Sequence, residues 1–163
     1  MFSYNTPIVA QDGTVSGKLM VELVRTAGEM TRPQEEEEES CSLSSSEEGE
    51  SESGQLSFRL RLMTVSGLPP ALAHFVFCQF SLWDSAQPHL VPSRPRNSNK
   101  TTDFVFNYSK DFTVAVTEEF RRFCGEKSIS VSVFGHKSKG FFSLREALQD
   151  RRRAQVPLKP LCN

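Results

Sequence analysis

Tryptophan, histidine and cysteine are scarce in the sequence. Its 163 residues include one tryptophan, three histidines and four cysteines. Cys41, Cys78, Cys124 and Cys162 lie far apart, and no C-x-x-C or paired-histidine spacing indicates a zinc site. The histidines lie in no nucleophile pattern such as G-x-S-x-G, so structural or surface roles are expected for them. We therefore predict free thiols, no catalytic residue, no bound metal and no cofactor.

The sequence also lacks a membrane-spanning segment, a leader region and an ATP-binding motif. No window approaches the roughly 18 apolar residues of a membrane span, and neither a basic nor an apolar leader region follows Met1. The phosphate-loop pattern G-x-x-x-x-G-K-[ST] is also missing, so ATP binding is not expected. These features predict a soluble, unsecreted, cytoplasmic protein, and nothing in the sequence favours nucleic acid or a small-molecule substrate as a ligand.

An acidic insert at residues 33–54 separates two parts of the chain that have ordinary composition. From Gln34 to Gly54 there are nine glutamates, seven serines and one large aliphatic residue, Leu43. Such a segment cannot bury enough surface to offset the entropy of ordering it, so we expect it to be disordered. Ser44 and Ser45 each have a glutamate three residues on, a pattern that predicts phosphorylation by acidophilic kinases. The alternative is a solvated spacer.

Alternating apolar residues predict most of the strands. From Leu56 the apolar residues recur with period two through Leu62, and Thr64 is expected to continue the buried face. The aromatic density from His74 to Trp83 predicts a core strand, covered on both sides or central in a sandwich. After a short extended piece at Pro7–Ala10, the six predicted strands are Lys18–Thr26, Leu56–Thr64, His74–Trp83, Thr101–Tyr108, Asp111–Val116 and Ser128–Phe134.

Loops and helices connect these strands. Three prolines predict a long loop over Asp84–Lys100, and the polar pair Ser109 and Lys110 predicts a hairpin link between two strands. Thr117 is expected to cap a short helix that Gly125 ends.

A second capping pattern occurs near the end of the sequence. Ser143 with Glu146 three residues on predicts a short helix there. Short strands without strand–helix–strand alternation indicate an all-β or β-rich α+β domain, an antiparallel sandwich with one or two short helices.

The run from Gly67 to Asp84, GLPPALAHFVFCQFSLWD, resembles the kinesin-3 family in its C2-like region, downstream of the motor and forkhead-associated domains. Three further blocks follow in the family's order, within Val105–Val114, Val116–Phe120 and Val131–Lys137. The resemblance covers Gly54–Lys137, with a weaker match at residues 17–28, and residues 138–163 diverge from it. The divergence predicts a splice form, a truncated product or a partial gene model, and a truncated product would lack strands needed to complete its sheet.

The resemblance implies a C2-like sandwich and a domain organisation. Residues 1–16 are expected to form an extended segment, 17–28 a first strand region, 55–137 the C2-like core, and 138–163 a divergent helix and tail. Kinesin-3 proteins are ATP-driven microtubule motors that carry organelles, and the motor is absent here. The implied function is a non-catalytic module that contributes to cargo or adaptor attachment and to motor regulation. A cytoskeletal location is expected where the chain forms part of a motor.

Two binding alternatives remain open. The loop at residues 84–100 offers calcium only Asp84, so a stand-alone C2-like module would be calcium-independent and would bind a protein or an anionic lipid surface. Arg94, Arg96 and Lys100 are the predicted contacts to an anionic membrane, unless they belong to a solvated loop.

Aromatic residues predict a second kind of contact. A docking patch for a protein partner, either a cargo adaptor or another kinesin domain, is expected to draw on part of a set of phenylalanines, with core packing as the alternative. These are Phe120, Phe123, Phe141 and Phe142.

Overall fold

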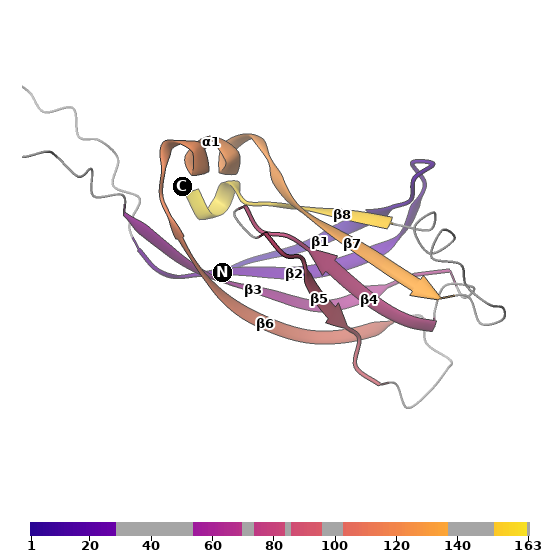
Figure 1. The fold of residues 1–163 in the computed structure, drawn as a ribbon. Coiled ribbons are helices and arrows are strands. Elements are labelled where there is room, and N and C mark those ends of the chain that lie inside the picture. Colours follow the sequence, from indigo (N-terminus) through magenta and orange to yellow (C-terminus); the bar gives the residue numbers. More distant parts are fainter. Residues whose placement is uncertain (29–53, 70–73, 84–85, 96–102, 137–151, 163) are drawn as a thin grey trace, which may run out of the picture.

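The structure is a computed structural model that describes residues 1–28, 54–69, 74–83, 86–95, 103–136 and 152–162 (Figure 1). The strands are β1 (Phe2–Val9), β2 (Val15–Ala27), β3 (Gln55–Ser66), β4 (His74–Phe80), β5 (His89–Pro92), β6 (Phe104–Ala115), β7 (Ser128–His136) and β8 (Arg152–Pro157). One α-helix, α1 (Glu118–Glu126), and one 3₁₀ turn, η2 (Lys159–Cys162), complete the described elements.

All eight described strands pair antiparallel in one sheet, in the order β5-β4-β7-β8-β1-β2-β3-β6. The sheet divides into two four-stranded halves at the β8–β1 junction, where Val9 pairs with Arg153. The halves face each other, because Phe80 on β4 meets Phe112 on β6 edge-on at a centroid distance of 6.3 Å. The predicted antiparallel, β-rich sandwich is therefore confirmed.

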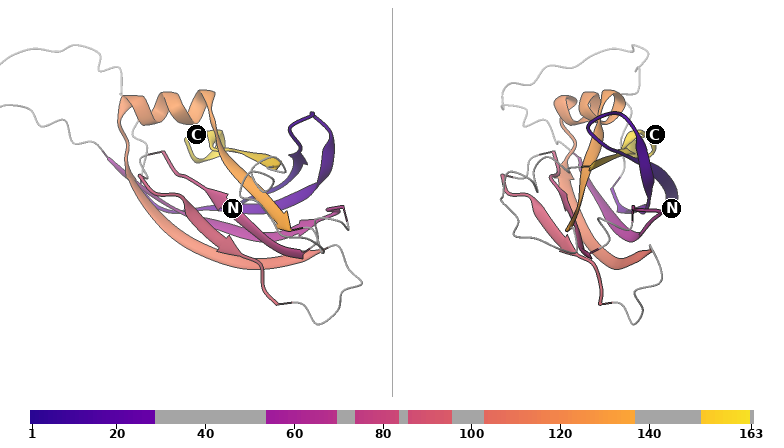
Figure 2. Two further views of the ribbon diagram at one scale, coloured as in Figure 1. Left: turned by 45° about the vertical axis from the view of Figure 1, so that its right-hand side comes forward. Right: turned by 90° about the vertical axis from the view of Figure 1, so that its right-hand side faces the viewer.

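The two edge strands approach each other, so the sheet nearly closes. The Arg94 backbone N–H, just after β5, donates to the Val105 carbonyl on β6 at 2.7 Å. At one end of the sandwich α1 packs against η2, and the β1–β2 turn lies at the other end (Figure 2). The apolar core fills the space between the two halves.

The period-two pattern places most of β3 correctly but not its end. Leu56, Leu60 and Leu62 are fully buried, as alternation predicts. Thr64 was expected on the same face, but it is only half-buried and Val65 is fully buried in its place. A β-bulge between Leu62 and Thr64 shifts the register by one residue, which moves each later side chain to the opposite face.

The predicted hairpin over residues 101–116 is wrong, because β6 is a single strand. Ser109 pairs with Arg61 and Lys110 with Leu60, both in the middle of β3. Strands β3 and β6 each have 12 residues, so the two halves of β6 pair with one long partner rather than with each other. The polar link expected at this point is part of an exposed edge strand.

Two strands lie in segments that were predicted to be irregular. The expected loop at residues 84–100 contains β5, which pairs with β4, and the expected tail at residues 138–163 contains β8. Strand β8 lies between β7 and β1 and joins the two halves of the sheet. Residues 152–157 thus form a strand of the sheet where a divergent helix and tail were expected.

Other local predictions have mixed outcomes. Strand β4 is interior to its half, as expected, but it ends at Phe80 rather than Trp83. The Thr117 hydroxyl accepts from the Phe120 N–H at 3.1 Å, which confirms the helix cap. Gly125 does not end α1, which continues to Glu126. The helix predicted from Ser143 and the acidic insert up to residue 53 lie outside the described residues.

Candidate functional site

Few of the predicted contact residues fall in the described part of the chain. Arg94 is exposed immediately beyond β5, at the point where its backbone meets β6. Arg96, Lys100, Ser44 and Ser45 lie outside the described residues. The anionic-surface contact and the two phosphorylation sites therefore stay predictions.

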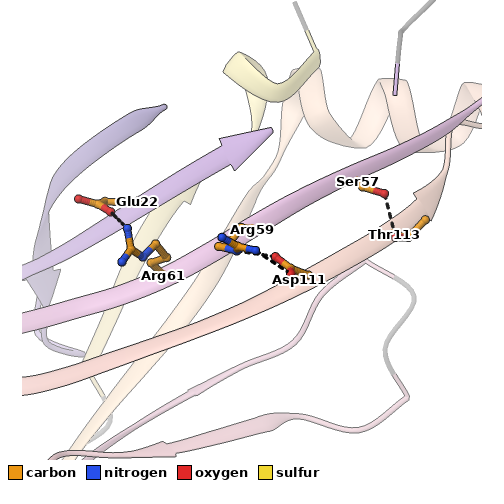
Figure 3. A network of polar contacts seen from close by, with 6 residues as sticks. All are labelled: Glu22, Ser57, Arg59, Arg61, Asp111 and Thr113. Atoms are coloured by element: carbon orange, nitrogen blue, oxygen red, sulfur yellow. Dashed lines mark hydrogen bonds and ion pairs between the residues drawn. The ribbon is translucent and has the colours of Figure 1, made fainter. Parts of the chain in front are cut away.

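A ladder of polar pairs covers the outer face of β2, β3 and β6 (Figure 3). Arg59 donates to both carboxylate oxygens of Asp111, at 2.6 and 3.0 Å, and Arg61 donates to Glu22 at 3.2 Å. The hydrogen bond and charge of Arg59 lower the pKa of Asp111. Both arginines of the ladder therefore have a carboxylate partner that compensates their charge.

His89 lies in an aromatic cluster where the sheet edges approach each other. Its ring stacks on Phe80 at 5.0 Å and meets Phe112 edge-on at 5.5 Å. Burial, followed by the nearby charge of Lys110, lowers the pKa of His89. The Lys110 Nζ is 3.3 Å from His89 Nδ1, so the neutral imidazole is favoured as a hydrogen-bond acceptor. These contacts fit the predicted structural role.

Two cysteines of the described residues lie in the core. Cys78 on β4 and Cys124 on α1 are almost fully covered by the core. Burial strongly raises the pKa of Cys78, so its reactive thiolate form is disfavoured. No group of three or more His, Cys, Asp or Glu side chains within the described ranges could hold a metal ion.

An open hollow of about 530 Å³ lies between α1 and the end of β4. We call it the Trp83 hollow, and it is lined by Trp83, Glu119, Arg122, Phe123, Glu126 and Lys127. Trp83 lies three residues beyond the end of β4. Its ring centroid is 4.9 Å from that of Phe123 and 6.3 Å from that of Phe120. Although it packs on α1, Trp83 remains 36% exposed.

The helix positions in this hollow result from the local sequence. Positions 119, 122, 123 and 126 follow the i, i+3, i+4, i+7 spacing of one helix side, which we call the α1 stripe. Phe120 and Cys124 occupy the buried side and hold α1 on the core. Among the described residues, no ion pair within 4.0 Å joins the charged members of the stripe to one another.

The structure divides the predicted phenylalanine patch. Phe120 is 1% exposed and belongs to the core, whereas Phe123 is partly buried and lines the hollow. Phe141 and Phe142 lie outside the described residues. The sequence prediction missed Trp83, which it placed in a covered strand. Alternation from Val76 through Phe80 would have assigned Trp83 to the outward face.

Comparison with known proteins relates the chain to kinesins. It is 36% identical to kinesin-like protein KIF13A of Mus musculus and 35% identical to its Homo sapiens counterpart, each over 153 residues and 84% of this chain. It is 31% identical to human kinesin-like protein KIF13B over 82% of this chain. These matches support the resemblance to kinesin-3 proteins.

The chain spans only 8–9% of the length of these relatives. No family model matches the chain. Within the described residues, no helix is long and apolar enough to cross a membrane.

Proposed function

We propose that the chain is a non-catalytic binding module of a kinesin-3-like microtubule motor. The module contributes to cargo or adaptor attachment and to motor regulation in organelle transport. The observation that carries this proposal is the distribution of the similarity, which spans 84% of this chain but only 9% of mouse KIF13A. A β-rich sandwich that corresponds to one short segment of a long motor protein has the size of a single accessory domain.

Binding explains the geometry better than catalysis does. The described thiols are buried, and His89 is packed among aromatic rings rather than beside a nucleophile. By contrast, Trp83 is exposed beside a hollow, and tryptophan is enriched at the centres of protein interfaces. A protein partner in the cytoplasm, either a cargo adaptor or another kinesin domain, therefore suits the module.

An anionic lipid surface is the second candidate ligand. The exposed position of Arg94 at the edge of the sandwich favours lipid binding. The polar ladder argues against lipid binding, because Arg59 and Arg61 already pair with carboxylates. Each basic residue contributes only about 1 kcal/mol at such a surface, so several unpaired ones are needed for firm binding.

A segment exchange in a full-length relative tests the proposed function. The matching segment of mouse KIF13A is replaced by this chain, and the transport of labelled vesicles is compared with that of unmodified KIF13A and of a segment-deleted form. We expect the chimera to restore transport that the deletion loses. A second chimera with Val156→Asp, which places a charge in the fully buried interior of β8, should behave like the deletion.

The outcomes separate the alternatives. If the native chimera is no better than the deletion, the proposed function is wrong. If the Val156→Asp chimera restores transport equally well, transport does not depend on the folded module.

A further inference from the structure

The α1 stripe places three charges of alternating sign around one aromatic residue. Glu119, Arg122 and Glu126 follow one another along the helix axis, and Phe123 lies between the last two. With a rise of 1.5 Å per residue, the two glutamates are about 10 Å apart along the axis. A stripe of this length matches two to three turns of a second helix packed alongside.

Trp83 gives this stripe an apolar centre. Its ring contacts Phe123 at 4.9 Å with a tilt of 53°, yet more than a third of the residue is exposed. Interface centres commonly combine a Trp or Arg anchor with surrounding groups that exclude water. Arg122 and Trp83 thus supply both anchor types in one hollow.

The charges decide which kind of ligand fits. The hollow is lined by two acidic residues, Glu119 and Glu126, and by two basic ones, Arg122 and Lys127. Their charges cancel, so this surface has no net positive charge to attract lipid phosphates, and a membrane is disfavoured here. A partner with the complementary order base–acid–base would pair all three charged residues of the stripe. Because acid–base–acid is the same in both directions, the partner can lie parallel or antiparallel to α1.

We propose that the Trp83 hollow binds an α-helix of a partner protein. This helix places a large apolar side chain against Trp83 and Phe123, and its basic, acidic and basic residues face Glu119, Arg122 and Glu126. The inference deepens the protein-binding function proposed above and rests on it. It names the binding surface and the chemistry of its partner.

Synthetic helical peptides test this site without any kinesin. The matched peptide carries Lys-x-x-Glu-Phe-x-x-Lys on one helix face, and the reversed peptide carries Glu-x-x-Lys-Phe-x-x-Glu, with compensating charges on the far face so that net charge is equal. Fluorescence anisotropy of labelled peptides gives the affinity. Trp83 is the only tryptophan of the chain, so its emission reports directly on the hollow.

We expect the matched peptide to bind about tenfold more tightly than the reversed one, because three exposed charge pairs change from attraction to repulsion. Trp83→Ala should weaken the matched peptide by roughly tenfold or more. The combined variant Glu119→Lys, Arg122→Glu and Glu126→Lys should reverse the preference between the peptides. Val15→Ala serves as the matched control, since Val15 is 65% exposed at the start of β2, next to the β1–β2 turn.

Several results would overturn the proposed site. These are no binding of either peptide up to about 1 mM, equal affinity for both, an unaltered affinity in Trp83→Ala, or an unaltered preference in the charge-reversed variant. Circular dichroism of each variant verifies that it is folded. The peptide assay and the KIF13A exchange use different readouts. The peptide assay can therefore disprove the helix-binding site while the exchange supports the transport function, and the exchange can disprove the transport function while the peptide assay supports the site.

Discussion

At the scale of single residues, two glycines allow β2 and β3 to pair along their whole length. Gly17 and Gly28 have φ angles of 128° and 97°, a region that side chains disfavour. A Cβ atom at Gly17 would collide with the Ser66 carbonyl, and one at Gly28 would collide with the Gln55 carbonyl. Glycine at both positions therefore lets the backbones of β2 and β3 approach closely at both ends of their pairing. The two strands pair in this way although the acidic insert separates them in sequence.

His89 should make stability depend on pH. Its pKa in the folded protein lies below the ordinary value of 6.5, chiefly through burial and secondarily through Lys110. The unfolded chain therefore binds the proton more readily, so the stability from neutral His89 is present above pH 6.5 and is lost as pH falls through the folded-state pKa. The free energy of unfolding should decrease from about pH 7.5 to about pH 5.5.

Urea titrations across this pH range measure the effect, and His89→Gln is the control because it retains a polar side chain that does not titrate. The variant should show a flatter pH dependence than the native protein. An identical slope in both proteins would assign the effect to other groups.

At the scale of elements, the sequence predicts what local patterns determine. Alternation identifies β3 and β7, and the Thr117 cap identifies the start of α1. Strands β5 and β8 escape prediction because proline ends β5 and two arginines begin β8, so only their long-range pairing makes them strands. The Trp83 hollow could not be predicted either, because it depends on the packing of α1 beside the end of β4, which local sequence does not determine.

Removing the helix cap tests how much α1 depends on local sequence. Thr117→Ala leaves the Phe120 N–H without its side-chain acceptor, which should lower the free energy of unfolding by about 1 kcal/mol. Thr117→Ser retains the hydroxyl and should recover most of this loss. Urea denaturation followed by circular dichroism measures both variants. Equal stability of Thr117→Ala and the native protein would show that core packing of Phe120 alone holds the helix.

At the scale of the whole molecule, the two halves of the sheet depend on each other. The halves share one apolar core, which includes Leu60 on β3, Phe80 on β4 and Val156 on β8. Strand β8 also connects the halves through its backbone pairing with β7 and with β1. Neither half alone could bury enough surface to offset its conformational entropy.

The described sandwich should therefore unfold as one unit. Trp83 fluorescence reports on the α1 end of one half, whereas far-ultraviolet circular dichroism reports on strands of both halves, so the two probes should give coincident urea transitions. Val156→Ala creates a cavity in β8 and should shift both transitions together by about 1–3 kcal/mol without changing their slope. If the fluorescence transition separated from the dichroism transition, the halves would be independent folding units, and the continuity of the sheet through β8 would not couple them.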